Sequence, residues 1–320
     1  MQVRNESAAG AGLGFAVASA VAFGMSGPFA RALADTGWSS GAAVSARIGL
    51  GAVALLGPAA YAMRGRWSVL ASLRVHLMLA FYALVAVTIP QLCYFYAVST
   101  LDVAVALLIE YTSPVAVVAW MWLRHGQQPT RLTFVGGLIA AAGLVLVLQL
   151  FGSVSLDAAG VAWAIGAMVG SAGYFILSGN SDSAVPGIAM ASFGLLYSAA
   201  ILAIVGLLGI LPMTASTASV ELAGQQYPWW VAVAGLGLIT AAFAYATGIA
   251  AVRRLGPRLA AFIALTEVLA AIVAAWLLLD QVPDRIQLVG GALVLAGVIV
   301  IKKGERVVSD DAETEVPVTV

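Results

Sequence analysis

Apolar segments of about twenty residues recur along the whole chain and leave it few possible folds. They lie at about residues 12–34, 39–63, 76–98, 102–123, 132–150, 157–178, 187–210, 229–251, 257–279 and 285–302. As a helix rising 1.5 Å per residue, each is long enough to cross a hydrocarbon core of about 30 Å. We therefore expect an all-α polytopic membrane protein with ten transmembrane helices.

The composition agrees with a lipid bilayer as the solvent. Only 9% of the residues are charged, against about 25% in soluble domains. The net charge is zero, which gives no reason to expect a nucleic-acid partner. Cys93 is the single cysteine, and His76 and His125 are far apart, so we expect no disulfide and no metal site. No ATP-binding loop is present, and we expect no cofactor.

The positive charges predict the orientation. With a cytoplasmic N-terminus, the inside loops and tails hold twelve of the fifteen Lys and Arg residues, and the outside loops hold only Arg285. Lys and Arg favour cytoplasmic loops. This asymmetry predicts a multi-pass protein of the cell (cytoplasmic) membrane with both termini in the cytoplasm. Residues 1–11 form the predicted N-terminal tail, and the polar tail at 303–320 is predicted to be disordered.

An internal repeat divides the chain into two halves. Residues 97–147 align without a gap on residues 251–301 after a shift of 154, with about a third of the positions identical. Each half, at 12–150 and 157–302, holds five spans, so the second must enter the membrane from the opposite side. Two inverted five-helix repeats with a site near the midplane are typical of secondary transporters.

Glycines recur at one spacing in the last span of each repeat. Gly136 and Gly143 lie seven residues apart, and so do Gly290 and Gly297. Small residues at such positions let helices approach closely. We expect the fifth and tenth spans to pack within one chain, which favours a monomer over a dimer.

Two glutamates, Glu110 and Glu267, lie inside apolar spans, where a carboxylate costs at least about 2.5–3.5 kcal/mol. A desolvated carboxylate can exchange protons near neutral pH, so both are candidate proton or substrate-amine sites. Arg47 is predicted at the depth of Glu110. A structural Arg47–Glu110 ion pair is therefore an open alternative to a functional role.

Each of the remaining intramembrane candidates can be interpreted in two ways. Gln91 and Tyr245 are repeat equivalents that either line a cavity or form interhelical hydrogen bonds. The candidate aromatic wall of a cavity, which could equally be packing, is Tyr94, Tyr111, Trp163 and Tyr174. Candidate hinge or packing positions are Gly24, Pro28, Pro90, Pro114, Gly290 and Gly297.

Several of these patterns together resemble a known family. The Glu110-Tyr-Thr-Ser-Pro114 run, the Arg253-Arg-Leu-Gly-Pro-Arg258 loop and the paired Gly-Gly spans look like the EamA-type transporters of the drug/metabolite transporter superfamily. The region around Glu110 is most similar to threonine/homoserine exporter-like members. The chain departs from the family at Glu267-Val268, where Glu-Pro is frequent. The resemblance implies a ten-helix carrier, often an exporter of amino acids or other small metabolites.

The favoured function is a secondary transporter, not an enzyme, that exports small organic metabolites by alternating access. The proton gradient or the solute gradient would drive it. One alternative is efflux of cationic drugs, with the acids binding the cation and aromatic rings stacking on it. A more distant alternative is an intramembrane enzyme, but no catalytic set lies at membrane depth. The last alternative is a membrane receptor, a function for which an inverted repeat has no evident use.

Overall fold

The computed structural model describes residues 2–98, 100–101, 103–150, 157–179 and 185–314, with side chains described between residues 10 and 304. Within this part of the chain, nine helical spans are long and apolar enough to cross a membrane, and a tenth apolar helix, Arg131–Val147, is shorter. The all-α polytopic fold predicted from the sequence is therefore confirmed. The fifth span is 17 residues long rather than the predicted 19.

The first repeat contains α1 (Gln2–Gly24), α2 (Ser26–Ala34), α3 (Ser40–Ala62), η1 (Trp67–Ala71), α4 (Leu73–Tyr82), η2 (Ala83–Thr88), α5 (Ile89–Ala97), α6 (Val103–Glu110), α7 (Ser113–His125) and α8 (Arg131–Val147). The second contains α9 (Ala158–Ser178), α10 (Gly187–Leu207), β1 (Val220–Leu222), β2 (Gln225–Tyr227), α11 (Trp229–Ala234), η3 (Gly235–Phe243), α12 (Ala244–Leu255), α13 (Pro257–Ala264), α14 (Glu267–Leu279) and α15 (Arg285–Thr314). Five spans are composite: α1–α2, α4–η2–α5, α6–α7, α11–η3–α12 and α13–α14.

The element boundaries reproduce the sequence repeat. Shifting α6 by 154 residues gives 257–264, the bounds of α13, and shifting α7 gives 267–279, the bounds of α14. The π-helical segment η2 shifts to 237–242, which lies within η3. The repeat is incomplete at its start, because the first span is broken at Met25 whereas its counterpart α9 is continuous.

Three segments differ from the sequence prediction. The last helix continues to Thr314, so residues 303–314 are helical and not disordered, and residues 315–320 lie outside the described part. At the other terminus, helix α1 already begins at Gln2, inside the predicted tail. The segment between α10 and α11 contains an antiparallel pair, β1–β2, that the all-α prediction did not include, and its register pairs Val220 with Tyr227.

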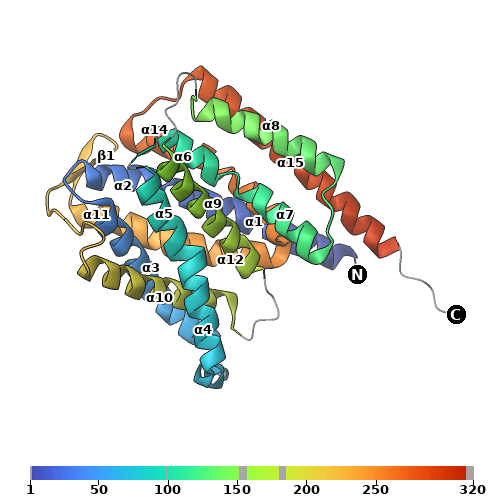
Figure 1. The fold of residues 1–320 in the computed structure, drawn as a ribbon, viewed down its shortest axis with the longest axis horizontal. Helices are drawn as coiled ribbons and strands as arrows, with labels where there is room; N and C mark the ends of the chain where they lie inside the picture. The colour runs from blue at the N-terminus through green and yellow to red at the C-terminus, as the bar shows by residue number, and fades with distance from the viewer. Residues whose placement is uncertain (1, 99, 102, 151–156, 180–184, 315–320) are drawn as a thin grey trace.

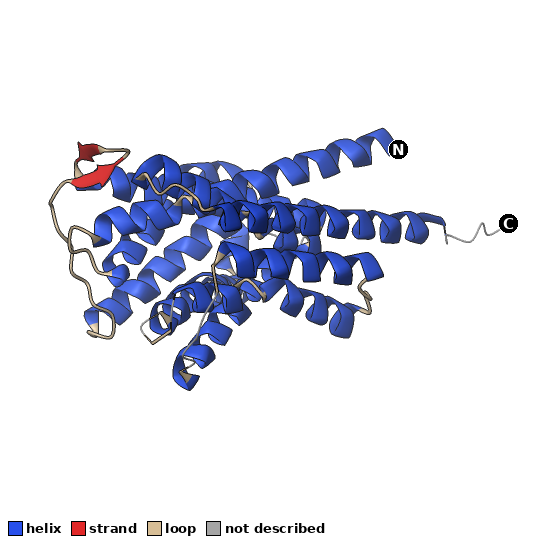
Figure 2. Cartoon of the chain, turned by 90° about the horizontal axis from the view of Figure 1, so that it is seen from above, coloured by secondary structure: helices blue, strands red, loops and turns tan. Residues whose placement is uncertain are grey.

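Both termini lie at one end of the bundle and the β-hairpin lies at the other (Figure 2). We call these the terminus end and the hairpin end. Because both termini lie at the same end, the arrangement agrees with an even number of membrane crossings. Helices α8 and α15 run side by side along one edge of the molecule (Figure 1).

Glycines allow the close contact of α8 with α15. A Cβ atom at Gly136 would lie 2.7 Å from the carbonyl oxygen of Gly297, and one at Gly143 would lie 2.6 Å from that of Gly290. The predicted packing of the fifth span against the tenth within one chain is therefore confirmed.

We expect Gly143→Ala to lower the melting temperature in detergent. Alanine is the better helix former by about 1 kcal/mol, but overpacking a close contact costs about 1–3 kcal/mol. Here the new Cβ would meet backbone atoms of Gly290 and Val294 that cannot move aside easily. Gly137→Ala is the matched control, since its Cβ would meet only Phe262, at 3.8 Å. Equal melting temperatures for the two variants would contradict the packing.

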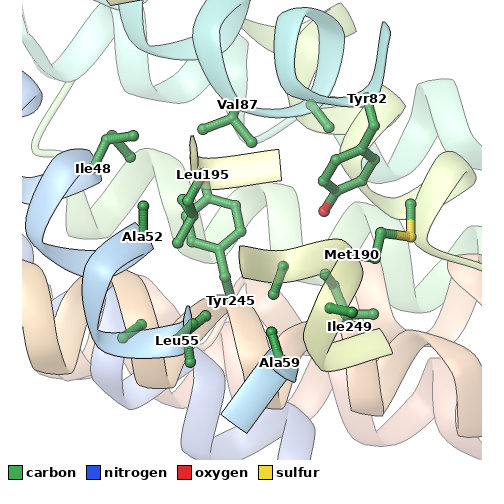
Figure 3. Packing of buried hydrophobic residues seen from close by; sticks show 14 of the residues in the cluster. Ile48, Ala52, Leu55, Ala59, Tyr82, Val87, Met190, Leu195, Tyr245 and Ile249 are labelled. Carbon is green, nitrogen blue, oxygen red and sulfur yellow. The ribbon is translucent and has the colours of Figure 1, made fainter. Parts of the chain in front are cut away.

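The largest apolar core lies among α3, η2, α10 and α12. Figure 3 shows Ile48, Val87, Leu195 and Tyr245, one from each of these elements, packed together. Two buried hydroxyl groups in the same region are paired: Thr88 Oγ1 and Ser198 Oγ lie 2.9 Å apart. This core fixes the second, third, seventh and eighth spans relative to one another.

Candidate functional site

The helix breaks at matched positions of the two repeats place four residues around one cavity. In the first repeat α6 ends at Glu110 and α7 begins at Ser113. In the second, α13 ends at Ala264 and α14 begins at Glu267. All four residues line the cavity. Each repeat thus contributes one carboxylate to the cavity. Glu110 lies directly before the break of the first repeat, and Glu267 lies directly after the equivalent break of the second.

The same local hydrogen bond occurs at both breaks. Thr112 Oγ1 donates to the carbonyl oxygen of Ile109 at 2.6 Å, and Thr266 Oγ1 donates to that of Ile263 at 2.7 Å. A threonine hydroxyl bonded to a nearby carbonyl competes with the regular helical ladder. The two threonines are repeat equivalents, so the sequence encodes both breaks in the same way.

The cavity has two lobes that meet at the broken helices. The larger, of about 570 Å³, extends to the hairpin end, where Trp38, Ser39 and Ser40 line it. The smaller, of about 150 Å³, extends toward the terminus end, as far as Val252 and Ala260. Residues lining both lobes are Phe23, Ser26, Arg47, Pro90, Gln91, Glu110, Ser171, Phe175, Ala264 and Glu267.

The cavity is open at the hairpin end, because Ser40 at its mouth is exposed. The loop between α10 and β1 is attached to this mouth: Trp38 Nε1 donates to the carbonyl oxygen of Ser216 at 2.7 Å, and Ser39 Oγ donates to that of Pro212 at 2.6 Å.

The terminus end is closed. Ala251 and Val252, at the floor of the smaller lobe, are buried. At the same end Arg258 Nη2 donates to the carbonyl oxygen of Gln127 at 3.1 Å and links the two repeats. The conformation is therefore open on one side only.

Glu110 has a defined partner within the cavity. Ser171 Oγ, from α9, donates to its Oε1 at 2.8 Å. The sequence analysis did not predict Ser171 as a site residue. The hydrogen bond orients the Glu110 carboxylate while leaving its second oxygen available.

Glu267 is the first residue of α14. Within the described part of the chain its carboxylate has no hydrogen bond and no ion pair. Its main chain is fixed by the first span, since a Cβ atom at Gly24 would lie 2.6 Å from the Glu267 carbonyl oxygen. Gly24 thus lets the break of the first span meet the break of the ninth.

Arg47 lines both lobes and is 8% exposed. Its Nη2 donates to the carbonyl oxygen of Thr240 at 2.8 Å, in the π-helical segment η3. Its Cζ lies 5.7 Å from the centre of the Phe23 ring. In the described structure it lies within ion-pair distance of neither glutamate, so the predicted Arg47–Glu110 pair is not formed in this conformation.

The structure brings together most of the other predicted site residues. Gln91, Tyr94 and Tyr111 line the larger lobe, and Tyr174 and Tyr245 line the smaller one. Trp163 lines neither lobe, which agrees with the packing interpretation. It is half-exposed and packs against Tyr96 at a ring distance of 5.1 Å, away from both lobes. Cavity aromatics that the sequence analysis missed are Phe23, Trp38, Phe95 and Phe175.

The predicted hinge or packing residues all lie at close contacts or at helix starts. Pro28 and Pro114 are buried in the first turns of α2 and α7. Pro90 follows the π-helical segment η2 and faces Gly170, where a Cβ would lie 2.6 Å from its Cδ. The contacts of Gly24 with α14, and of Gly290 and Gly297 with α8, account for these three as packing positions.

Comparison with known proteins identifies the family. The sequence profile of the EamA-like transporter family matches residues 10–149 and 158–302, one match for each repeat. The chain belongs to the EamA-like transporter family. It is therefore a multi-pass membrane transporter of the drug/metabolite transporter superfamily.

A solved structure titled only "Crystal structure of protein" shares the fold of this EamA-like transporter. It is 19% identical, with a TM-score of 0.67, and the match covers 93% of this chain and 98% of the other. At this identity the likeness concerns the fold alone. The search of curated proteins found no match.

Proposed function

We propose that this EamA-like transporter is a secondary carrier that exports small organic metabolites, amino acids foremost, across the cell membrane by alternating access. The observation that carries the proposal is the one-sided cavity with Glu110, Glu267 and Arg47 on its walls. Its larger lobe of about 570 Å³ lies within the range of small-molecule sites, roughly 300–1,000 Å³. Inverted repeats around a site near the midplane support alternating access.

The distribution of charge supports an orientation with the terminus end in the cytoplasm. Arg64, Arg74 and Arg124 lie in or beside the loops of that end, together with most of the other basic residues, whereas Arg285 lies at the hairpin end. Positive residues favour the cytoplasmic side. In this orientation the conformation described here faces outward, the state from which an exporter releases its solute.

Two acids in the cavity provide candidate sites for proton coupling. A carboxylate held away from water exchanges its proton according to its surroundings, and a solute ammonium group can compete for the same charge. Proton entry from outside would then drive release of the solute. Glu110 and Glu267 are the two candidate residues for this exchange.

Efflux from proteoliposomes tests the proposal. Vesicles are loaded with a mixed pool of amino acids and cationic dyes, and the released solutes are measured by mass spectrometry with and without a pH gradient. We expect selective release of amino acids that responds to the gradient. Release no faster than from protein-free vesicles would refute the proposal.

Lipophilic cations are the second candidate substrate class. The cavity has two carboxylates against one guanidinium, and the rings of Tyr94 and Tyr111 line its larger lobe. Such rings can stack on an organic cation. Release of the dyes in place of the amino acids would favour this class.

A further inference from the structure

We propose that Arg47 and Glu267 form a two-point subsite that binds the carboxylate and the ammonium group of a free α-amino acid. This inference rests on the proposed function and deepens it. It assigns the substrate carboxylate to Arg47 and the substrate ammonium group to Glu267. The substrate must therefore carry both charges. Glu110 is left as a separate acid for proton exchange.

The first argument is the state of the Arg47 side chain. It is 8% exposed and lines the cavity, yet Nη2 donates only to the main chain of Thr240 and Nε has no hydrogen-bond partner. Among the described residues no carboxylate lies within ion-pair distance of the guanidinium, so its charge is balanced only by the longer-range attraction of Glu267. A carboxylate from the solute would supply the missing charge and accept from the planar donors of the guanidinium.

The local fold holds Arg47 in this position. A Cβ atom at Gly51, one helical turn further along α3, would lie 2.7 Å from the Cβ of Ala241, so the two helices touch there. This contact brings α3 against the π-helical segment η3, whose Thr240 carbonyl oxygen accepts from Arg47. The guanidinium is therefore oriented by main-chain atoms, which leaves its charge available to a ligand.

The second argument is that Glu267 is the other charged group on the same wall that has no direct partner among the described residues. Its carboxylate has no hydrogen bond within the described residues, whereas Glu110 accepts from Ser171. Two consecutive residues connect the pair: the Phe23 ring lies beside Arg47, and Gly24 packs against the main chain of Glu267. Both charges thus flank the break of the first span, and no ion pair joins them.

The charges of Arg47 and Glu267 determine which class of ligand the subsite can bind. One guanidinium and one carboxylate that form no ion pair with each other match the carboxylate and ammonium groups that an α-amino acid carries on its α-carbon. A simple amine would leave Arg47 uncompensated and would be repelled by it. A simple carboxylic acid would leave Glu267 uncompensated and would be repelled by it. The subsite then discriminates against a ligand with only one charge, because such a ligand leaves one buried charge of the subsite unpaired.

Three loading pools test the inference in proteoliposomes: the protein L-amino acids, their carboxamides, which keep only the ammonium group, and their N-acetyl derivatives, which keep only the carboxylate. We expect the wild-type protein to release the free amino acids at least about tenfold faster than either derivative. The two variants are Arg47→Gln and Glu267→Gln. Arg285→Gln and Glu221→Gln, at exposed positions of the hairpin end, are the matched controls.

Arg47→Gln should lose selectivity for free amino acids over carboxamides, and Glu267→Gln should lose selectivity over N-acetyl derivatives. Arg47→Lys, which keeps the positive charge, should restore part of the first selectivity. Wild-type release of carboxamides as fast as free amino acids would overturn the inference while leaving the carrier function intact, and this result needs no variant to fold. Release of none of the pools would instead refute the proposed function.

Discussion

Replacing Glu110 with glutamine is expected to abolish the coupling of transport to a pH gradient. A gradient of one pH unit supplies about 1.4 kcal/mol per proton, so a carrier that exchanges one proton can build up to about a tenfold solute ratio. A glutamine cannot ionise at the position of Glu110. Its side-chain oxygen can still accept from Ser171 Oγ, which keeps the local structure. The measured quantity is the steady-state solute ratio across the vesicle membrane, which should fall to one while downhill exchange continues.

The control for this variant is Glu221→Gln, at the exposed middle residue of strand β1. It carries the same chemical change at the hairpin end but lies outside the cavity, so its solute ratio should equal that of the wild type. Coupling that persists in Glu110→Gln at the wild-type ratio would remove Glu110 from the proton pathway. Glu267 would then be the remaining acid of the cavity to examine.

The backbone breaks of the fourth and ninth spans were not predicted from the sequence, although the repeat that encodes them was recognised. A shift of 154 residues matches Thr112 with Thr266, and each threonine makes the same bond to the carbonyl three residues before it. Local chemistry of this kind is repeated wherever the sequence is repeated. The sequence analysis located both acids inside apolar spans, but it predicted no helix break beside either of them.

The surroundings of Arg47 could not be predicted in this way. Its partner is a main-chain oxygen of Thr240, and the π-helical segment that contains this residue leaves no clear periodic signal in an apolar sequence. Trp163 shows the same difficulty. Its aromatic ring suits a cavity wall or an outer surface equally, and only the rotation of α9 within the bundle, with Trp163 against Tyr96, distinguishes the two.

Labelling of single cysteines is expected to show a cavity accessible from the outside alone. In a Cys93→Ala background, a membrane-impermeant maleimide added to intact cells should label Ser40→Cys, at the mouth, and Ser26→Cys, which lines both lobes. It should not label Ser72→Cys, which is exposed in the loop before α4 at the terminus end, until the cells are opened. The expected contrast is nearly complete labelling against none, because the bilayer excludes the reagent.

The same cysteines separate orientation from conformation. If Ser72→Cys were labelled in intact cells and Ser40→Cys were not, the hairpin end would be cytoplasmic and the protein described here would face inward, the state in which an exporter loads its solute. If Ser40→Cys were labelled and Ser26→Cys were not, the orientation would stand but the lobes would be closed off in the membrane. An amino acid bound between Arg47 and Glu267 would lie beside Ser26, which begins α2 directly after the break of the first span. Added substrate should therefore slow the labelling of Ser26→Cys and leave that of Ser40→Cys unchanged, which connects the accessible cavity to the proposed subsite.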